Sequence, residues 1–198
     1  MLTTQKYCID ESHGLLHSME VLHYANQIFE LEKSRDFRLE KQEKIIYVSA
    51  IIHDMCDKKY MNENDGLKNI EDFLQEKITK DETQIVKHII SRMSYSTVKK
   101  NGFPELNDYQ TAYHIVREAD LLSAYNFDRA MIFSTSVHGT DVENAFVNTE
   151  KLFHSRMLKH IDDGLFITNT GKNIAIGLET NAITRLNSWK QILDKDLL

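Results

Sequence analysis

Four side chains in this sequence have the chemical types that a divalent metal site requires. They are two histidines and two aspartates: His17, His53, Asp54 and Asp120. Imidazoles and carboxylates together suit a first-row ion such as Mn, Fe, Co, Ni or Zn, and Mg less well. Four protein ligands around an octahedral ion leave two positions for water or substrate, and an open position marks a catalytic site. Such an ion would polarise a phosphoryl oxygen and lower the pKa of a bound water molecule, which makes a nucleophile at neutral pH.

The dipeptide His53-Asp54 is the strongest local signal. It ends an almost uninterrupted apolar run that begins at Ile45. Such a run belongs in a protein interior, where a carboxylate and an imidazole are costly to bury unless a partner satisfies them. A metal ion is one such partner. The spacing of the four residues alone is not specific, so the alternative is that His53 and Asp54 cap a helix or form hydrogen bonds within a helical bundle.

The elements that must position these residues are predicted to be helices. The 198 residues include only 7 glycines and 1 proline, and strong helix formers are common. We expect residues 1–10 to be extended, 94–107 to be a loop and 165–168 to be the best short strand candidate. Helical spacing of apolar residues predicts helices over about 12–31, 39–57, 67–77, 82–93, 108–137, 142–161 and 172–193.

The first helix is predicted to have two apolar sides, one with Leu15 and Met19 and the other with His17. A helix of this kind lies inside a bundle, so we expect His17 to point into the protein. In the second helix, Ser49 and Ala50 stand one turn before the His53-Asp54 pair, and their small side chains would leave room above it.

Composition and charge limit the class of protein. The chain is 41% hydrophobic and 27% charged, with a net charge of −6 and no block of five like charges. We therefore expect a folded chain that does not bind a nucleic-acid polymer. Two cysteines make no disulfide framework, no signal peptide begins the chain and no run of 18 apolar residues could span a membrane. We therefore expect one soluble, cytoplasmic domain over residues 1–198. The sequence makes no prediction of its oligomeric state.

In their order along the chain, His17, His53-Asp54 and Asp120 resemble the H…HD…D signature of the HD-domain superfamily of metal-dependent phosphohydrolases. Residues 12–21 look like that family's first metal-ligand helix, and residues 115–122 look like the helix that brings the final Asp. Residues 53–60 and 89–96 are similar to a branch of soluble single-domain proteins that includes nucleotide phosphohydrolases. The resemblance covers roughly residues 10–135. It implies an all-α HD-domain helical bundle and one divalent ion, Mn, Co, Ni, Fe, Zn or Mg, on His17, His53, Asp54 and Asp120.

The resemblance also suggests catalytic roles beyond the ligands. Asp57 stands where the family tends to carry a second acidic residue, so it would orient the attacking water or protonate the leaving oxygen. Lys59 matches the branch and would pair with a phosphate oxygen. Arg92 and Arg117 are further candidates for phosphate contact. The alternatives are a solvent-exposed helix-terminal Asp57 and a salt bridge for Arg117.

The function implied is hydrolysis of a phosphate ester or anhydride, with a nucleotide as the preferred substrate. The chain departs from the branch at Glu20 and after Asp120. These departures motivate an alternative, a regulatory module that holds a metal and binds nucleotides without turnover. A second alternative is a metal-dependent oxygenase with two ions, for which His88 and His114 would be additional ligands.

Overall fold

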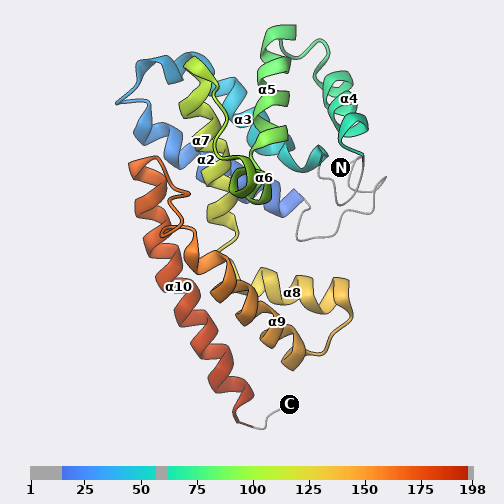
Figure 1. Ribbon diagram of the computed structural model, residues 1–198, viewed down its shortest axis with the longest axis vertical. Coiled ribbons are helices and arrows are strands. Elements are labelled where there is room, and N and C mark those ends of the chain that lie inside the picture. Colours follow the sequence, from blue (N-terminus) through green and yellow to red (C-terminus); the bar gives the residue numbers. More distant parts are fainter. Residues whose placement is uncertain (1–14, 57–61, 196–198) are drawn as a thin grey trace. The chain divides into compact units, whose positions relative to one another are not determined.

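The computed structural model describes residues 15–56 and 62–195, and within these residues the chain is all-α. Figure 1 shows helices joined by short turns. The predicted fold class is therefore confirmed, whereas the assignment to the HD superfamily stays a prediction. Residues 1–10, the predicted extended arm, lie outside the described residues. The best short strand candidate, 165–168, forms no strand, because Leu165 to Ile167 are irregular and Thr168 caps the final helix.

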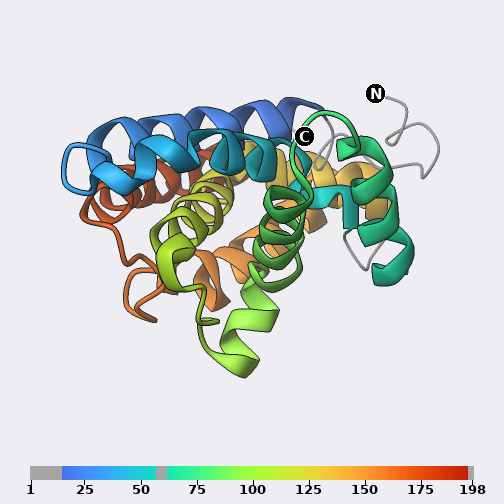
Figure 2. The ribbon, with the colours of Figure 1, turned by 90° about the horizontal axis from the view of Figure 1, so that it is seen from above.

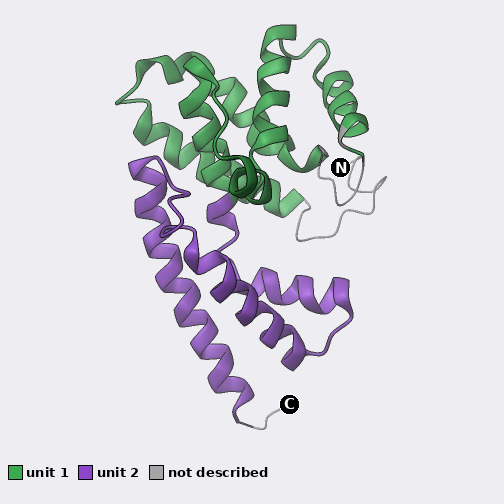
Figure 3. Ribbon diagram, viewed as in Figure 1, with its two compact units in different colours: residues 1–120 green, residues 121–198 purple. Residues whose placement is uncertain are grey.

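Two compact units make up the chain, residues 1–120 and residues 121–198 (Figure 3). All four candidate ligands belong to the first unit, and Asp120 is its last residue. The described helical elements that begin in this unit are α2 (Leu15–Glu32), η2 (Phe37–Gln42), α3 (Glu43–Ile52), η3 (His53–Cys56), α4 (Glu63–Leu74), α5 (Lys80–Arg92), α6 (Tyr95–Asn101), η4 (Asn107–Tyr109) and α7 (Gln110–Ser123).

Helices α2 and α3 run side by side in opposite directions, as Figures 1 and 2 both show. Val21 and Ile28 of α2 and Ile46 of α3 are completely buried. The prediction that α2 buries two sides holds only in part: on the side that carries Leu15 and Met19, Phe29 is 1% exposed, whereas Leu15 and Met19 are mostly exposed. One arc of α2, which includes His17, Val21 and Ile28, faces the interior, as the 100° spacing of an α-helix dictates.

The predicted second helix, 39–57, divides into three pieces. A 3-10 helix comes first, then α3, and the chain tightens into another 3-10 turn at His53. The small residues Ser49 and Ala50 are completely buried one turn before His53. The apolar run therefore forms a helix that is buried except at Ile51 and, in part, at Tyr47 and Val48. The His-Asp pair begins at the point where its α-helical geometry ends.

Helix α5 packs against α3 and α4, and its start is fixed by Thr79. The Thr79 hydroxyl oxygen accepts from the backbone N–H of Glu82 at 3.2 Å, and the Glu82 carboxylate accepts from the backbone N–H of Thr79 at 2.7 Å. This reciprocal pair is a capping box, which satisfies two donors that the first helical turn leaves without partners.

A short helix, α6, occupies part of the predicted loop 94–107. The Ser94 hydroxyl oxygen accepts from the backbone N–H of Thr97, and Gly102 ends the helix with a φ of 74°. A positive φ favours glycine because a Cβ would be strained there. The predicted helix 108–137 is also divided, because the side chain of Asn126 caps a new helix at Phe127.

The second unit contains three longer helices around a core with Phe127, Phe146 and Phe153. Asp128 ties the first of these helices to the last, since its carboxylate accepts from the Arg185 guanidinium at 2.9 Å and from the Trp189 indole at 2.8 Å. No helix among residues 15–56 and 62–195 combines the length and apolar character needed to cross a membrane. The elements of the second unit are α8 (Phe127–His138), α9 (Val142–Ser155), η5 (Met157–Lys159) and α10 (Asn169–Leu193).

Replacement of Thr79 by Ala should destabilise the protein by about 1 kcal/mol, because the α5 capping box loses its hydroxyl. Chemical denaturation would measure the change in the free energy of unfolding. The matched control is Thr184→Ala, an exposed threonine within α10, which should change that free energy by less than about 0.5 kcal/mol. Equal effects of the two substitutions would contradict the stabilising role of the cap.

Candidate metal site

The side chains of His17, His53 and Asp120 converge from α2, η3 and α7. One ligand atom of each residue lies within 4.8 Å of the ligand atoms of the other two. The two Nε2 atoms are 3.1 Å apart, and Oδ1 of Asp120 lies 3.5 Å from Nε2 of His17 and 3.6 Å from Nε2 of His53. Three of the four predicted ligands thus form a tight group.

Asp54 approaches this group with both of its oxygens. Oδ2 lies 3.3 Å from Nε2 of His17, and Oδ1 lies 3.3 Å from Nε2 of His53. The carboxylate therefore faces both imidazoles. The group whose ligand atoms all lie within 4.8 Å of one another contains only His17, His53 and Asp120. The structure brings all four predicted residues to one place.

His53 is oriented by its own helix. Its Nδ1 lies 2.8 Å from the carbonyl oxygen of Ala50, which can only accept a hydrogen bond, so Nδ1 carries the proton. In the neutral imidazole, Nε2 then presents a lone pair to His17 and the carboxylates. A hydrogen bond from the second ring nitrogen to a carbonyl is the usual support of a metal-bound histidine.

The spacing of the donors fits an ion of the first row. Three atoms separated by 3.1, 3.5 and 3.6 Å lie about 2.0 Å from the centre of their triangle, close to the length of Zn–N and Zn–O bonds in proteins. The set consists of borderline nitrogen and hard oxygen donors, and its two carboxylates balance a charge of +2. These residues therefore fit a divalent ion, while the presence and the identity of an ion are not established.

Accessibility differs between the two kinds of ligand. The imidazoles of His17 and His53 are 4% and 3% exposed, whereas the carboxylates of Asp54 and Asp120 are 18% and 30% exposed. The protein thus encloses both imidazoles and Oδ2 of Asp54, and the site is most open at Asp120. An ion held there would keep a face toward solvent or substrate.

The other predicted site residues are not part of this group. Asp57 and Lys59 lie outside the described residues, so their catalytic roles stay predictions. Arg92 is exposed at the end of α5. Arg117 is only 1% exposed and its guanidinium lies over the ring of Phe103, so direct contact with a substrate phosphate would require that ring to move. Phosphate contact by either arginine stays a prediction.

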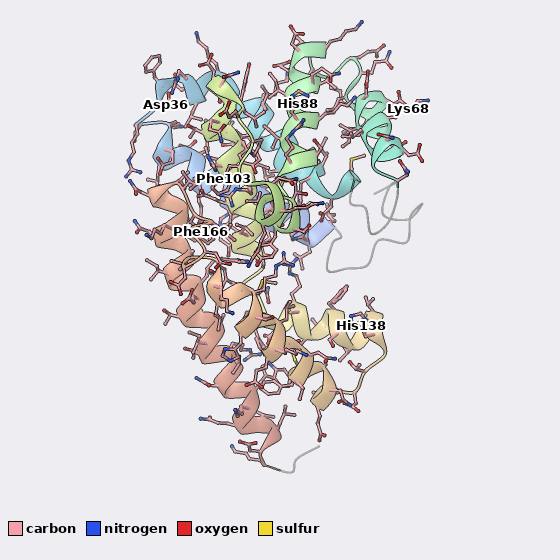
Figure 4. All side chains as sticks on the ribbon, viewed as in Figure 1. Asp36, Lys68, His88, Phe103, His138 and Phe166 are labelled. Carbon is pink, nitrogen blue, oxygen red and sulfur yellow. The ribbon has the colours of Figure 1, made fainter. Side chains whose placement is uncertain are left out.

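The two histidines proposed for a second ion lie in different surroundings. His88 is exposed on α5 (Figure 4), whereas His114 is buried on α7. The Gln110 oxygen accepts from the backbone N–H of Leu106, so its amide nitrogen faces Nε2 of His114 at 3.0 Å and donates to it. Among the described residues, neither histidine joins a group that could hold an ion.

Burial is the main cause that lowers the pKa of His114 to about 4, and the positive charge of Arg117 lowers it further. The His114 ring also lies edge-on to Phe103 and Tyr113. This histidine is consequently a neutral part of the interior at physiological pH.

Comparison of the chain with protein-family models, with curated protein sequences and with solved structures gave no match. Assignment of the site therefore depends on the chemistry and geometry of its residues.

Sequence reasoning missed two structural features around the candidate site. The carbonyl of Ala50 could not have been found, because a backbone acceptor has no sequence signal. The enclosure of Arg117 by Phe103 was also missed, because Phe103-Pro104 indicated only a loop. Spacing did place Arg117 three residues before Asp120, on a shared side of one helix.

His114 should make stability depend on pH. Its folded pKa of about 4 lies below the unfolded value of about 6.5, so the unfolded chain binds more protons between these values and stability falls as pH falls through this window. We expect this residue to contribute a loss of about 2–3 kcal/mol between pH 6.5 and pH 4. Urea unfolding of His114→Gln over this range should show a shallower pH dependence than the wild type.

The control is His23→Gln, which replaces an exposed histidine of α2 and should retain the wild-type pH dependence. Identical slopes for the wild type and His114→Gln would contradict the neutral, buried state of His114.

Proposed function

We propose that this chain is a metal-dependent phosphohydrolase that holds one divalent ion with His17, His53, Asp54 and Asp120. Its substrate would be a phosphate ester or anhydride, with a nucleotide as the preferred class. The observation that carries the proposal is the convergence of two buried imidazoles and two partly exposed carboxylates within 3.1–3.6 Å.

The partial exposure of the carboxylates favours catalysis over a structural role. Four protein ligands would close a tetrahedral zinc site, whereas around an octahedral ion they leave two positions open for water or substrate. Here the open side is that of Asp120, whose side chain is 30% exposed, since Oδ2 of Asp54 is itself buried. A phosphate oxygen or a water molecule would reach the site from that side without displacing an imidazole.

A bound ion would polarise a phosphoryl oxygen and supply a nucleophilic water at neutral pH. The chain's own residues divide the remaining work. His53, fixed by the Ala50 carbonyl, keeps its lone pair directed into the site, and the buried face around His17 limits the access of solvent. Asp57 would hold the proton that the leaving oxygen requires, and Lys59 would neutralise phosphate charge. Arg92 is an exposed cation that could serve the same purpose.

The nucleotide as substrate rests on the resemblance to single-domain HD proteins around residues 53–60 and 89–96. The chain differs from the residue pattern of that branch at Glu20 and after Asp120. These differences support the alternative function, a module that binds nucleotides without turnover. The two functions share the metal site and differ in phosphate release.

Removal of the His17 imidazole should weaken metal binding by more than about 100-fold, because changes beyond the direct ligands already cost 10–100-fold. The measurement is calorimetric titration of His17→Ala with Mn²⁺ and Zn²⁺. His23→Ala is the matched control, because His23 lies on the same helix and is exposed. Unchanged affinity in His17→Ala would refute the site.

Activity is tested by release of phosphate or pyrophosphate from a panel of nucleotides with Mn²⁺, Co²⁺, Ni²⁺, Mg²⁺ or Zn²⁺. We expect turnover by the wild type and none by Asp54→Ala, with helical circular dichroism retained. Asp72→Ala, which replaces an exposed aspartate of α4, should keep full activity. Nucleotide binding without release for any metal would favour the binding module, and normal turnover by Asp54→Ala would contradict the ligand assignment.

A further inference from the structure

The buried arginine of α7 carries an inference that deepens the proposed function and rests on its metal site. Arg117 is the largest fully buried side chain among the described residues. Burial of a guanidinium is costly unless other groups compensate its charge and its hydrogen bonds. Its surroundings should therefore show what the chain gains from placing it there.

Aromatic rings and a carboxylate surround the guanidinium. Its central carbon lies 4.7 Å from the ring centroid of Phe103 and 6.0 Å from that of Tyr113, distances typical of cation–π contacts. One of its nitrogens lies 3.4 Å from Oε1 of Glu118, which is completely buried. Figure 4 shows Phe103, which follows α6, beside α7.

These contacts attach α7 to the preceding part of the unit. Phe103 comes from the segment after α6, and the Tyr113 hydroxyl donates to the carbonyl oxygen of Arg92 at 3.1 Å, at the end of α5. Tyr113, Arg117 and Asp120 lie within about 60° of one another around α7 at 100° per residue. The attached side of the helix is therefore the side that carries the metal ligand.

Rotation of α7 would displace that ligand. A carboxylate about 6 Å from a helix axis moves about 2 Å when the helix turns by 20°, which is the length of a whole metal–ligand bond. Asp120 lies one turn from Arg117. Burial lowers the pKa of the Arg117 guanidinium, and the negative charge of Asp120 is one of the smaller effects that raise this pKa.

We propose that Arg117 is a positioning residue: its guanidinium, enclosed by Phe103, Tyr113 and Glu118, holds α7 at the rotation that directs the Asp120 carboxylate toward His17 and His53. A planar guanidinium can stack on an aromatic ring and bind a carboxylate with its edge at the same time. A lysine ammonium retains the positive charge but lacks the planar group and its pair of parallel N–H donors. Arg117→Lys therefore tests the orienting role of the guanidinium while the charge is kept.

Cobalt(II) is a suitable probe, because affinity and the visible ligand-field spectrum can be measured in one titration. We expect Arg117→Lys to bind Co²⁺ about 10-fold or more weakly than the wild type, as expected when a support of a direct ligand is lost. Its spectrum should shift toward that of Asp120→Asn. A merely structural role would lower the unfolding temperature and leave the spectrum of the folded protein unchanged.

Two further variants sharpen the test. Phe103→Leu removes the aromatic face and should shift affinity and spectrum in the same direction by a smaller amount; it decides the question if Arg117→Lys does not fold. Arg156→Lys, in the second unit, should match the wild type in both measurements. Wild-type affinity and spectrum in a folded Arg117→Lys would overturn the positioning role of Arg117 and leave the metal site standing. If Arg117→Lys is unfolded, the same result in Phe103→Leu would do so. Failure of the wild type to bind Co²⁺, Mn²⁺ or Zn²⁺ would overturn the metal site and this inference together.

Discussion

The close approach of two imidazole nitrogens beside two carboxylates is the interaction on which the arrangement of the first unit depends. The Nε2 atoms of His17 and His53 are 3.1 Å apart in a region where both rings are almost fully buried. Groups of this kind are costly to remove from water unless a cation or a proton lies among them. The spacing and charge of these donors suit a divalent ion, which on the proposed function would offset that cost.

Each of these elements is built to hold its ligand still. Helix α3 is apolar and has small residues one turn before His53, and its Ala50 carbonyl fixes the imidazole. Helix α2 turns one arc inward, so that His17 follows the same side as Val21 and Ile28. Helix α7 brings Asp120 and, one turn earlier, a buried guanidinium that lies against Phe103. Rigid helices are well suited to a site in which displacements of an ångström matter.

The sequence was sufficient to predict the all-α fold and most of the helices, because helical periodicity acts locally. The convergence of the four candidate ligands was predicted from the resemblance to the H…HD…D signature, since their spacing alone is not specific. The side chains of Thr79 and Asp141, for example, cap the helices that begin at Lys80 and Val142. Features that depend on tertiary packing were not predictable. Leu15 and Met19 looked like core residues and are exposed. The burial of Arg117 likewise depends on a ring from another segment.

The central claim is that His17, His53, Asp54 and Asp120 hold one divalent ion. The most direct measurement is an anomalous difference map from crystals of the wild-type protein grown with Mn²⁺. The claim predicts one strong peak about 2.0–2.3 Å from both Nε2 atoms and from an oxygen of each carboxylate. A map with no peak among these four residues, or with the peak at other side chains, would contradict it.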